Sequence, residues 1–244
     1  MPTMIMMRLK ATWTVRPNTR QLHGLACALF EGDAAAHERQ QKPWAVWPLH
    51  QAGAPEEWEW RTAWLPDTTP PSCVITVDAL RVGHVSCSVR ESSQCRVSHA
   101  TLANAPPSEA AKITFGSPTY FSQNGADTVT PDPRLIVGSW RRQWNASLPA
   151  ADPLTISDEE WTATHRSLRL ASFDLRTECR DNGHGRDREG FTGTATIRLA
   201  RNAPPASRKI FGTLARFADY SGTGAQTTHG FGATTVSVLD RDPA

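Results

Sequence analysis

Hydrophobic residues in the first third of the chain change from strand spacing to helical spacing and back again. Residues 4–15 predict an opening strand, and residues 44–47 and 58–64 predict two more. Pro17-Asn18 precedes a stretch in which apolar residues recur every three or four positions, which predicts a helix between the first two strands. The apolar face of this helix consists of Leu22, Leu25, Ala26, Leu29 and Phe30.

A second series of elements is predicted after residue 108. Asp132 is followed by Pro133, a pair typical of a helix N-cap and of the first helical position. The helix that they open carries on one face Leu135, Ile136, Ser139, Trp140, Gln143 and Trp144. Further periodic segments predict strands over 113–121, 168–177, 191–199 and 233–239 and a helix over 208–219.

The order strand, helix, strand, strand, helix, strand is that of a ferredoxin-like or RRM-like α+β unit. Two such units in tandem fit the 244 residues. We expect an N-terminal unit over 1–108 and a C-terminal unit over 109–244, with a proline-containing linker at 105–108. Residues 74–102 of the first unit predict short pieces of helix and strand whose order the pattern does not fix.

Composition narrows the class of protein. A hydrophobic content of 39% is enough for a core, and the net charge of +2 says little about partners. The five cysteines are odd in number and form no Cys-x-x-Cys pair, which argues against a disulfide framework and a zinc site and favours a reducing compartment. Because no apolar run is long enough for a signal peptide or a membrane span, we expect a cytoplasmic protein without a membrane partner.

The segment Tyr220–Gly232, with the sequence Y-S-G-T-G-A-Q-T-T-H-G-F-G, contains four glycines between a predicted helix and the last predicted strand. Such a loop can direct backbone N–H groups toward a phosphate, or it can simply be a turn that ends the helix. Nucleotide-binding loops run from strand to helix, with the anion at the helix N-terminus. The opposite order here argues against a nucleotide cofactor, and no cofactor is expected.

Three segments together resemble one family. They are the Gly-rich loop Tyr220–Gly232, the stretch T-F-G-S-P-T-Y-F at 114–121 followed by P-D-P at 131–133, and K-P-W-A-V-W-P-L at 42–49. In this order and spacing the chain resembles the CRISPR-associated endoribonucleases of family six, RAMP-superfamily enzymes that cut precursor CRISPR RNA. The resemblance extends over roughly residues 1–240 and is weakest over 65–108, where the second helix of the family's N-terminal unit is expected.

The resemblance implies a catalytic histidine shortly after the first helix, and His37 occupies that place. Cleavage of RNA without a metal requires a base for the 2′-hydroxyl, an acid for the leaving 5′-oxygen and positive charge beside the phosphate. Lys42 follows His37 by five residues and can supply that charge. His23, within the first helix, lies near the place of a second catalytic side chain in the family, often a tyrosine. It either substitutes for that tyrosine or faces solvent.

The resemblance also implies contacts with RNA from two parts of the C-terminal unit. In the Gly-rich loop the candidate residues are Gly222, Gly224, Gln226, Thr227, His229 and Gly230. In the polar hairpin between the strands predicted over 168–177 and 191–199, Arg186 and Arg188 can follow an RNA backbone. An ordinary charged turn is the alternative for the hairpin, and the alternating tryptophans are expected to pack in a core rather than to stack on bases.

The resulting hypothesis is a metal-independent endoribonuclease that binds the CRISPR repeat and cuts precursor CRISPR RNA into guide RNAs. The products would carry a 5′-hydroxyl and a 2′,3′-cyclic or 3′-phosphate. The alternative is a non-catalytic RAMP subunit that binds guide RNA within an effector complex. The expected partners are repeat RNA and other Cas proteins, and the expected state is a monomer or homodimer.

Overall fold

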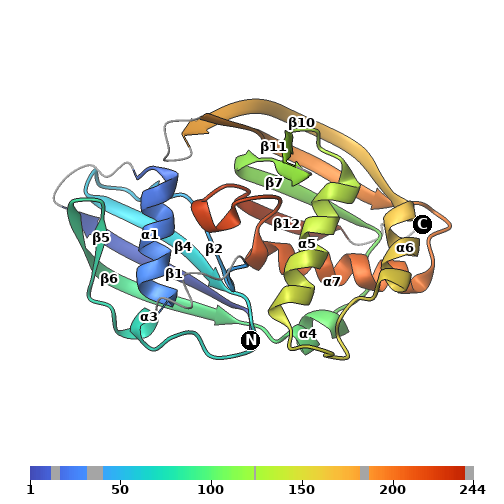
Figure 1. Ribbon diagram of the computed structural model, residues 1–244, viewed down its shortest axis with the longest axis horizontal. Helices are drawn as coiled ribbons and strands as arrows, with labels where there is room; N and C mark the ends of the chain where they lie inside the picture. The colour runs from blue at the N-terminus through green and yellow to red at the C-terminus, as the bar shows by residue number, and fades with distance from the viewer. Residues whose placement is uncertain (12–16, 32–40, 124, 182–186, 240–244) are drawn as a thin grey trace.

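The computed structural model describes residues 1–11, 17–31, 41–123, 125–181 and 187–239. Two antiparallel sheets lie side by side, and each is covered by helices (Figure 1). This α+β arrangement confirms the predicted fold class. Within the described residues, no helix has the length and apolar character needed to cross a membrane.

The first sheet has the strand order β2-β4-β1-β6-β5, with β3 paired to β4. Its strands are β1 (Thr3–Ala11), β2 (Trp44–Val46), β3 (His50–Gln51), β4 (Glu57–Trp64), β5 (Ala79–Val82) and β6 (Val85–Arg96). Helix α1 (Thr19–Phe30) begins at Asn18, whose side chain accepts from the Gln21 N–H while Gln21 bonds back to the Asn18 N–H. The predicted apolar face of α1 is buried and packs with the buried side chains of β1, β2 and β4.

Trp44, Trp58 and Trp60 of this unit are core residues, as expected, whereas Trp64 is only partly buried. Trp44, Trp58 and Trp60 are 0%, 6% and 0% exposed, so their rings are unavailable to a ligand. The second helix of the unit is much reduced: α3 (Cys73–Thr76) is a single turn. The following β5–β6 hairpin takes its place in the chain, which explains why residues 74–102 carry no long helical pattern.

The second sheet has the order β10-β11-β7-β12. Its elements are β7 (Ala110–Thr119), α5 (Pro133–Ser147), β10 (Leu168–Asp181), β11 (Asp187–Leu199), α7 (Pro205–Ser221) and β12 (Thr234–Leu239). This is the predicted strand–helix–strand–strand–helix–strand order. A small hairpin of β8 (Phe121–Gln123) and β9 (Ala126–Thr128) and the helix α6 (Asp158–Ser167) are added to it. Ile113 of β7 faces Ala195 of β11 and Val236 of β12, and all three are buried.

The two sheets are joined by polar contacts as well as by a shared core. Arg61 of β4 donates to the Asp219 carbonyl of α7 over 2.7 Å, and its guanidinium lies 4.5 Å from the ring centre of Trp47. The Asp219 carboxylate in turn accepts from the Val236 N–H of β12. Burial raises the pKa of Asp219 and lowers the pKa of Arg61. Arg61 and Asp219 therefore hold α7 and β12 against the first sheet.

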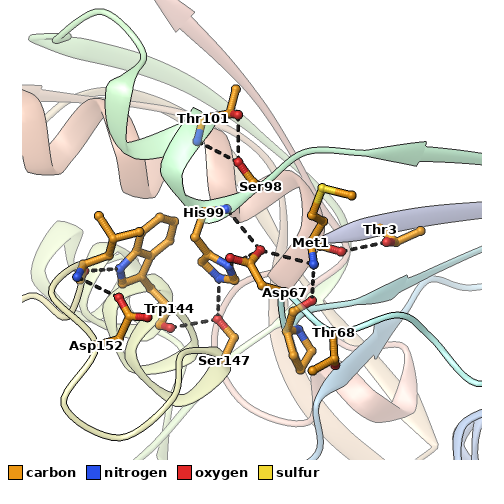
Figure 2. Close-up of polar contacts among 12 residues, drawn as sticks. Met1, Thr3, Asp67, Thr68, Ser98, His99, Thr101, Trp144, Ser147 and Asp152 are labelled. Carbon is orange, nitrogen blue, oxygen red and sulfur yellow. Dashed lines mark hydrogen bonds and ion pairs between the residues drawn. The ribbon is translucent and has the colours of Figure 1, made fainter.

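A second polar junction surrounds His99, the first residue of helix α4 (His99–Asn104; Figure 2). Its Nδ1 lies 2.9 Å from Asp67 Oδ1 and its Nε2 lies 2.7 Å from Ser147 Oγ, at the end of α5. The order Asp, His, Ser is that of a hydrolytic triad, but Ser147 is 6% exposed and lies at the C-terminus of a helix, where an oxyanion is disfavoured. The network is an anchor between α4, α5 and the segment after β4.

Candidate functional site

The Gly-rich loop of the second unit lies against the first unit. Helix α7 ends at Ser221, and the loop leads through a short 3-10 turn, η1 (Thr227–His229), into β12. In Figure 1 this red segment lies between α1 and α5, close to β2. The loop therefore meets α1, which carries His23.

The glycines of the loop are required by its own packing. A Cβ at Gly232, where φ is +62°, would lie 1.8 Å from the Thr223 carbonyl oxygen, and a Cβ at Gly224 would lie 2.4 Å from the Tyr120 carbonyl oxygen. Gly222 also has a positive φ as the C-cap of α7, and a Cβ at Gly230 would lie 2.9 Å from Leu22 of α1. All four glycines have a positive φ, and the atoms that an added Cβ would meet belong to the protein itself.

Helix α5 supports the loop through hydrogen bonds made by residues of its predicted face. Ser139 Oγ accepts from the Gly224 N–H, and the Trp140 indole donates to Thr223 Oγ1 over 2.8 Å. The Gln143 amide donates to Thr227 Oγ1, and Thr227 is buried. Thr227 thus has a supporting role in the loop, whereas Gln226, with φ +53°, is exposed.

The same loop places two histidines in contact. His23 Nδ1 lies 3.0 Å from the Thr228 carbonyl oxygen, and the rings of His23 and His229 are stacked with centroids 3.9 Å apart and planes 6° apart. His229 Nδ1 lies 3.0 Å from Thr228 Oγ1. Both histidines are partly exposed, so a ligand can approach them. His23 is therefore a member of an interface between the two units rather than a solvent-facing helix residue.

Lys42 lies at the other end of α1. Its Nζ is 2.6 Å from Glu31 Oε1, and the two side chains are 9% and 6% exposed. Glu31 is eight residues beyond His23, which corresponds to about 12 Å along a helix axis. Burial, together with a hydrogen bond to Glu31, raises the pKa of the Cys27 thiol to about 12. Lys42 also lines a cleft of about 530 Å³ with Gln143 and Ser147 of α5.

Two predicted site residues, His37 and Arg186, lie outside the described residues. Arg188 is described: at the start of β11 its guanidinium forms an ion pair with Asp127 of β9, and its side chain is 39% exposed. The hairpin arginine is thus held by a carboxylate of the protein. The roles of these residues toward RNA stay predictions.

Arg180 was missed by sequence reasoning because the predicted strand stopped at residue 177. The strand β10 continues to Asp181, and Arg180 Nη1 donates to the Gly230 carbonyl oxygen over 3.2 Å. Burial lowers the pKa of Arg180. The Thr19 hydroxyl of α1 donates to the Asp181 carbonyl, so the end of β10 contacts both α1 and the loop. A continuation of the strand pattern beyond Thr177 was the only signal in the sequence that could have extended the predicted strand to Arg180.

Within the described residues, no group of three or more His, Cys, Asp or Glu side chains lies close enough together to hold a metal ion.

Comparison with known proteins agrees with this arrangement. The family model of the CRISPR-associated endoribonuclease Cas6 matches residues 113–234, which is half of the chain. The chain belongs to the Cas6 family. A curated Cas6 endoribonuclease of Mycobacterium tuberculosis is 30% identical over 134 residues, which are 55% of this chain and 41% of that protein. The chain thus spans well under half the length of the curated relatives that it matches.

Solved Cas6 structures match nearly the whole chain. A Cas6 product complex is 28% identical, with a TM-score of 0.83 over 97% of this chain and 100% of that one. The Thermus thermophilus Cas6 is 27% identical, with a TM-score of 0.74 over 97% of this chain and 98% of that one. The resemblance inferred from the three sequence segments is therefore confirmed, including over the region where it is weakest.

Proposed function

We propose that this protein is an endoribonuclease that binds a CRISPR repeat and cuts precursor CRISPR RNA once per repeat, without a metal ion. The observation that carries the proposal is the contact of His23 with Thr228 and His229 at the junction of the two units. Family membership and the similar Cas6 product complex support RNA as the ligand. Imidazole groups can exchange protons near neutral pH, as this cleavage requires.

In this proposal the 2′-hydroxyl attacks the adjacent phosphate, a base removes its proton and an acid protonates the leaving 5′-oxygen. The products carry a 2′,3′-cyclic phosphate, which can open to a 3′-phosphate, and a 5′-hydroxyl. His37 and His23 are the candidate acid and base, and Lys42 is the candidate cation. Arg188, Arg186 and the exposed part of the Gly-rich loop bind the RNA backbone.

The second candidate is a non-catalytic RNA-binding subunit that assembles with other Cas proteins in the cytoplasm. The observation that favours it is the Lys42–Glu31 ion pair, since a buried ammonium bound to a carboxylate is less available to a phosphate. Such a subunit would bind repeat RNA and leave it intact.

Incubation of the purified protein with its cognate repeat RNA in EDTA separates the two candidates. The endoribonuclease predicts one cut with a 5′-hydroxyl end. His37→Ala should then slow the cut about 10²–10⁴-fold while RNA affinity stays within a few-fold of the wild type. Binding without any cut, in EDTA and with Mg²⁺ alike, would establish the non-catalytic subunit. Cleavage only with added metal would refute the metal-independent reaction.

A further inference from the structure

The tautomer of His23 is determined by a backbone group of the Gly-rich loop. A carbonyl oxygen accepts hydrogen bonds and cannot donate them, so the 3.0 Å contact requires a proton on His23 Nδ1. In the neutral ring the lone pair is then on Nε2, and in the charged ring the second proton is on Nε2. The nitrogen that exchanges protons is Nε2 in either state.

The plane of the His23 ring is determined by two aromatic neighbours. The His229 ring lies parallel to it at 3.9 Å, and the ring of Trp44 lies 5.2 Å away at 39°. Trp44 is 0% exposed and belongs to the core of the first unit. Stacking against one rigid neighbour and one loop neighbour limits rotation of the imidazole about its side-chain bonds.

His229 is itself held by the loop. Its backbone N–H donates to the Gln226 carbonyl over 2.9 Å, and the next residue, Gly230, has its carbonyl bound by Arg180. Gly230 packs closely against Leu22, the residue before His23 on α1, since a Cβ added at Gly230 would lie 2.9 Å from the Leu22 side chain. The loop therefore contacts α1 as one ordered segment. A displacement of the loop changes both the hydrogen bond from His23 to Thr228 and the stacking of His23 on His229.

We propose that the Gly-rich loop fixes the tautomer and the ring plane of His23, and that His229 is a positioning residue for the cleavage reaction. The catalytic part of this proposal rests on the proposed endoribonuclease function, whereas the control of the ring does not. His229 then acts mainly on the chemical step, in contrast to the RNA contact predicted from the sequence.

Two variants of the full chain test this role. His229→Ala removes the stacked ring, and His229→Phe keeps a flat ring while removing both nitrogens. His165→Ala, on the outer helix α6, is the matched control for loss of a histidine. For each protein, nitrogen-15 NMR of labelled histidines, with His23 assigned through His23→Gln, reports which ring nitrogen carries the proton. Single-turnover cleavage at saturating protein and RNA titration separate the rate from the affinity.

We expect protonated Nδ1 at His23 in the wild type and a mixture of tautomers in His229→Ala. The cleavage rate constant of His229→Ala should fall roughly 10²-fold, the effect of a small misplacement of a reacting group, with affinity within a few-fold. His229→Phe should recover most of that loss. An Nε2-protonated His23 in the wild type, or a His229→Ala variant with weaker binding and an unchanged rate, would overturn the proposal. If no variant cleaves RNA but the tautomers behave as expected, the endoribonuclease function fails and the control of the ring stands.

Discussion

Lys42 Nζ lies 2.6 Å from Glu31 Oε1, and both side chains are almost removed from solvent. Lys42, which the sequence analysis proposes as the cation beside the phosphate, is therefore also part of a buried ion pair at the end of α1. Loss of one partner of a buried pair is costly because the other charge stays behind in a poorly solvated place. A single substitution at Lys42 thus mixes an effect on stability with an effect on catalysis.

A double variant separates the two effects. Lys42→Ala alone should lower the free energy of unfolding by about 3–5 kcal/mol. Lys42→Met combined with Glu31→Gln removes both charges and should recover most of that loss in urea unfolding. We expect the double variant to cleave repeat RNA slowly although it is folded. Cleavage at the wild-type rate would assign Lys42 a structural role alone.

The pair Arg188–Asp127 predicts effects of opposite sign on RNA binding. If Arg188 contacts an RNA phosphate, the Asp127 carboxylate competes with that phosphate for the guanidinium. Arg188→Ala should weaken binding and reduce the slope of log affinity against log salt by roughly 0.7–0.9. Asp127→Ala should instead tighten binding, because it removes a negative charge that competes with the phosphate for the guanidinium and repels the RNA backbone.

Filter binding or fluorescence titration over a range of salt concentrations measures both effects. Arg198→Ala, on the far part of β11, is a control for the general loss of a positive charge. An Asp127→Ala variant that binds RNA no better than the wild type would argue against contact between Arg188 and the backbone.

The local elements of the fold were predictable because their signals are local. Asn18 and Asp132 each cap the helix that the sequence predicts after them. The site was less predictable because it depends on contacts between distant segments. His23 and Thr228 are 205 positions apart, and nothing in the spacing around either residue indicates the hydrogen bond between them.

The buried His99 predicts a dependence of stability on pH. Burial lowers the pKa of His99, and the nearby Asp67 carboxylate, which favours the charged ring, only partly offsets this effect. Because the folded pKa lies below the unfolded value of about 6.5, the unfolded chain binds the proton first as the pH falls. The contribution of the neutral ring is complete above about pH 6.5 and is lost as the pH falls toward the folded pKa.

Thermal or urea unfolding between about pH 7.5 and about pH 5 measures this loss. We expect His99→Gln to flatten the decline in stability over that range, because the amide does not titrate. His84→Gln, at an exposed position in the β5–β6 turn, should leave the decline unchanged. Equal declines in the wild type and in His99→Gln would contradict the assignment.

Three glycines in different surroundings predict a graded effect on stability. Gly24, on the exposed side of α1, has no atom within 4 Å of an added Cβ, so Gly24→Ala should stabilise the protein by about 0.5–1 kcal/mol. Gly125 has a φ of +80° but open space around it, so Gly125→Ala should cost only the conformational strain, about 1–2 kcal/mol. Gly232→Ala adds a Cβ at 1.8 Å from the Thr223 carbonyl oxygen and should cost more than either.

Chemical unfolding of the three variants tests this order, and a Gly232→Ala variant as stable as Gly125→Ala would show that the loop is not shaped by its own packing. The expected stability losses also determine which variant can test whether the loop binds RNA. A larger side chain at Gly224 or Gly232 disturbs the backbone before it meets a ligand, so weaker RNA binding there would not identify a contact. Gln226 is exposed, and Gln226→Ala should change RNA affinity without lowering the unfolding midpoint if this loop binds RNA.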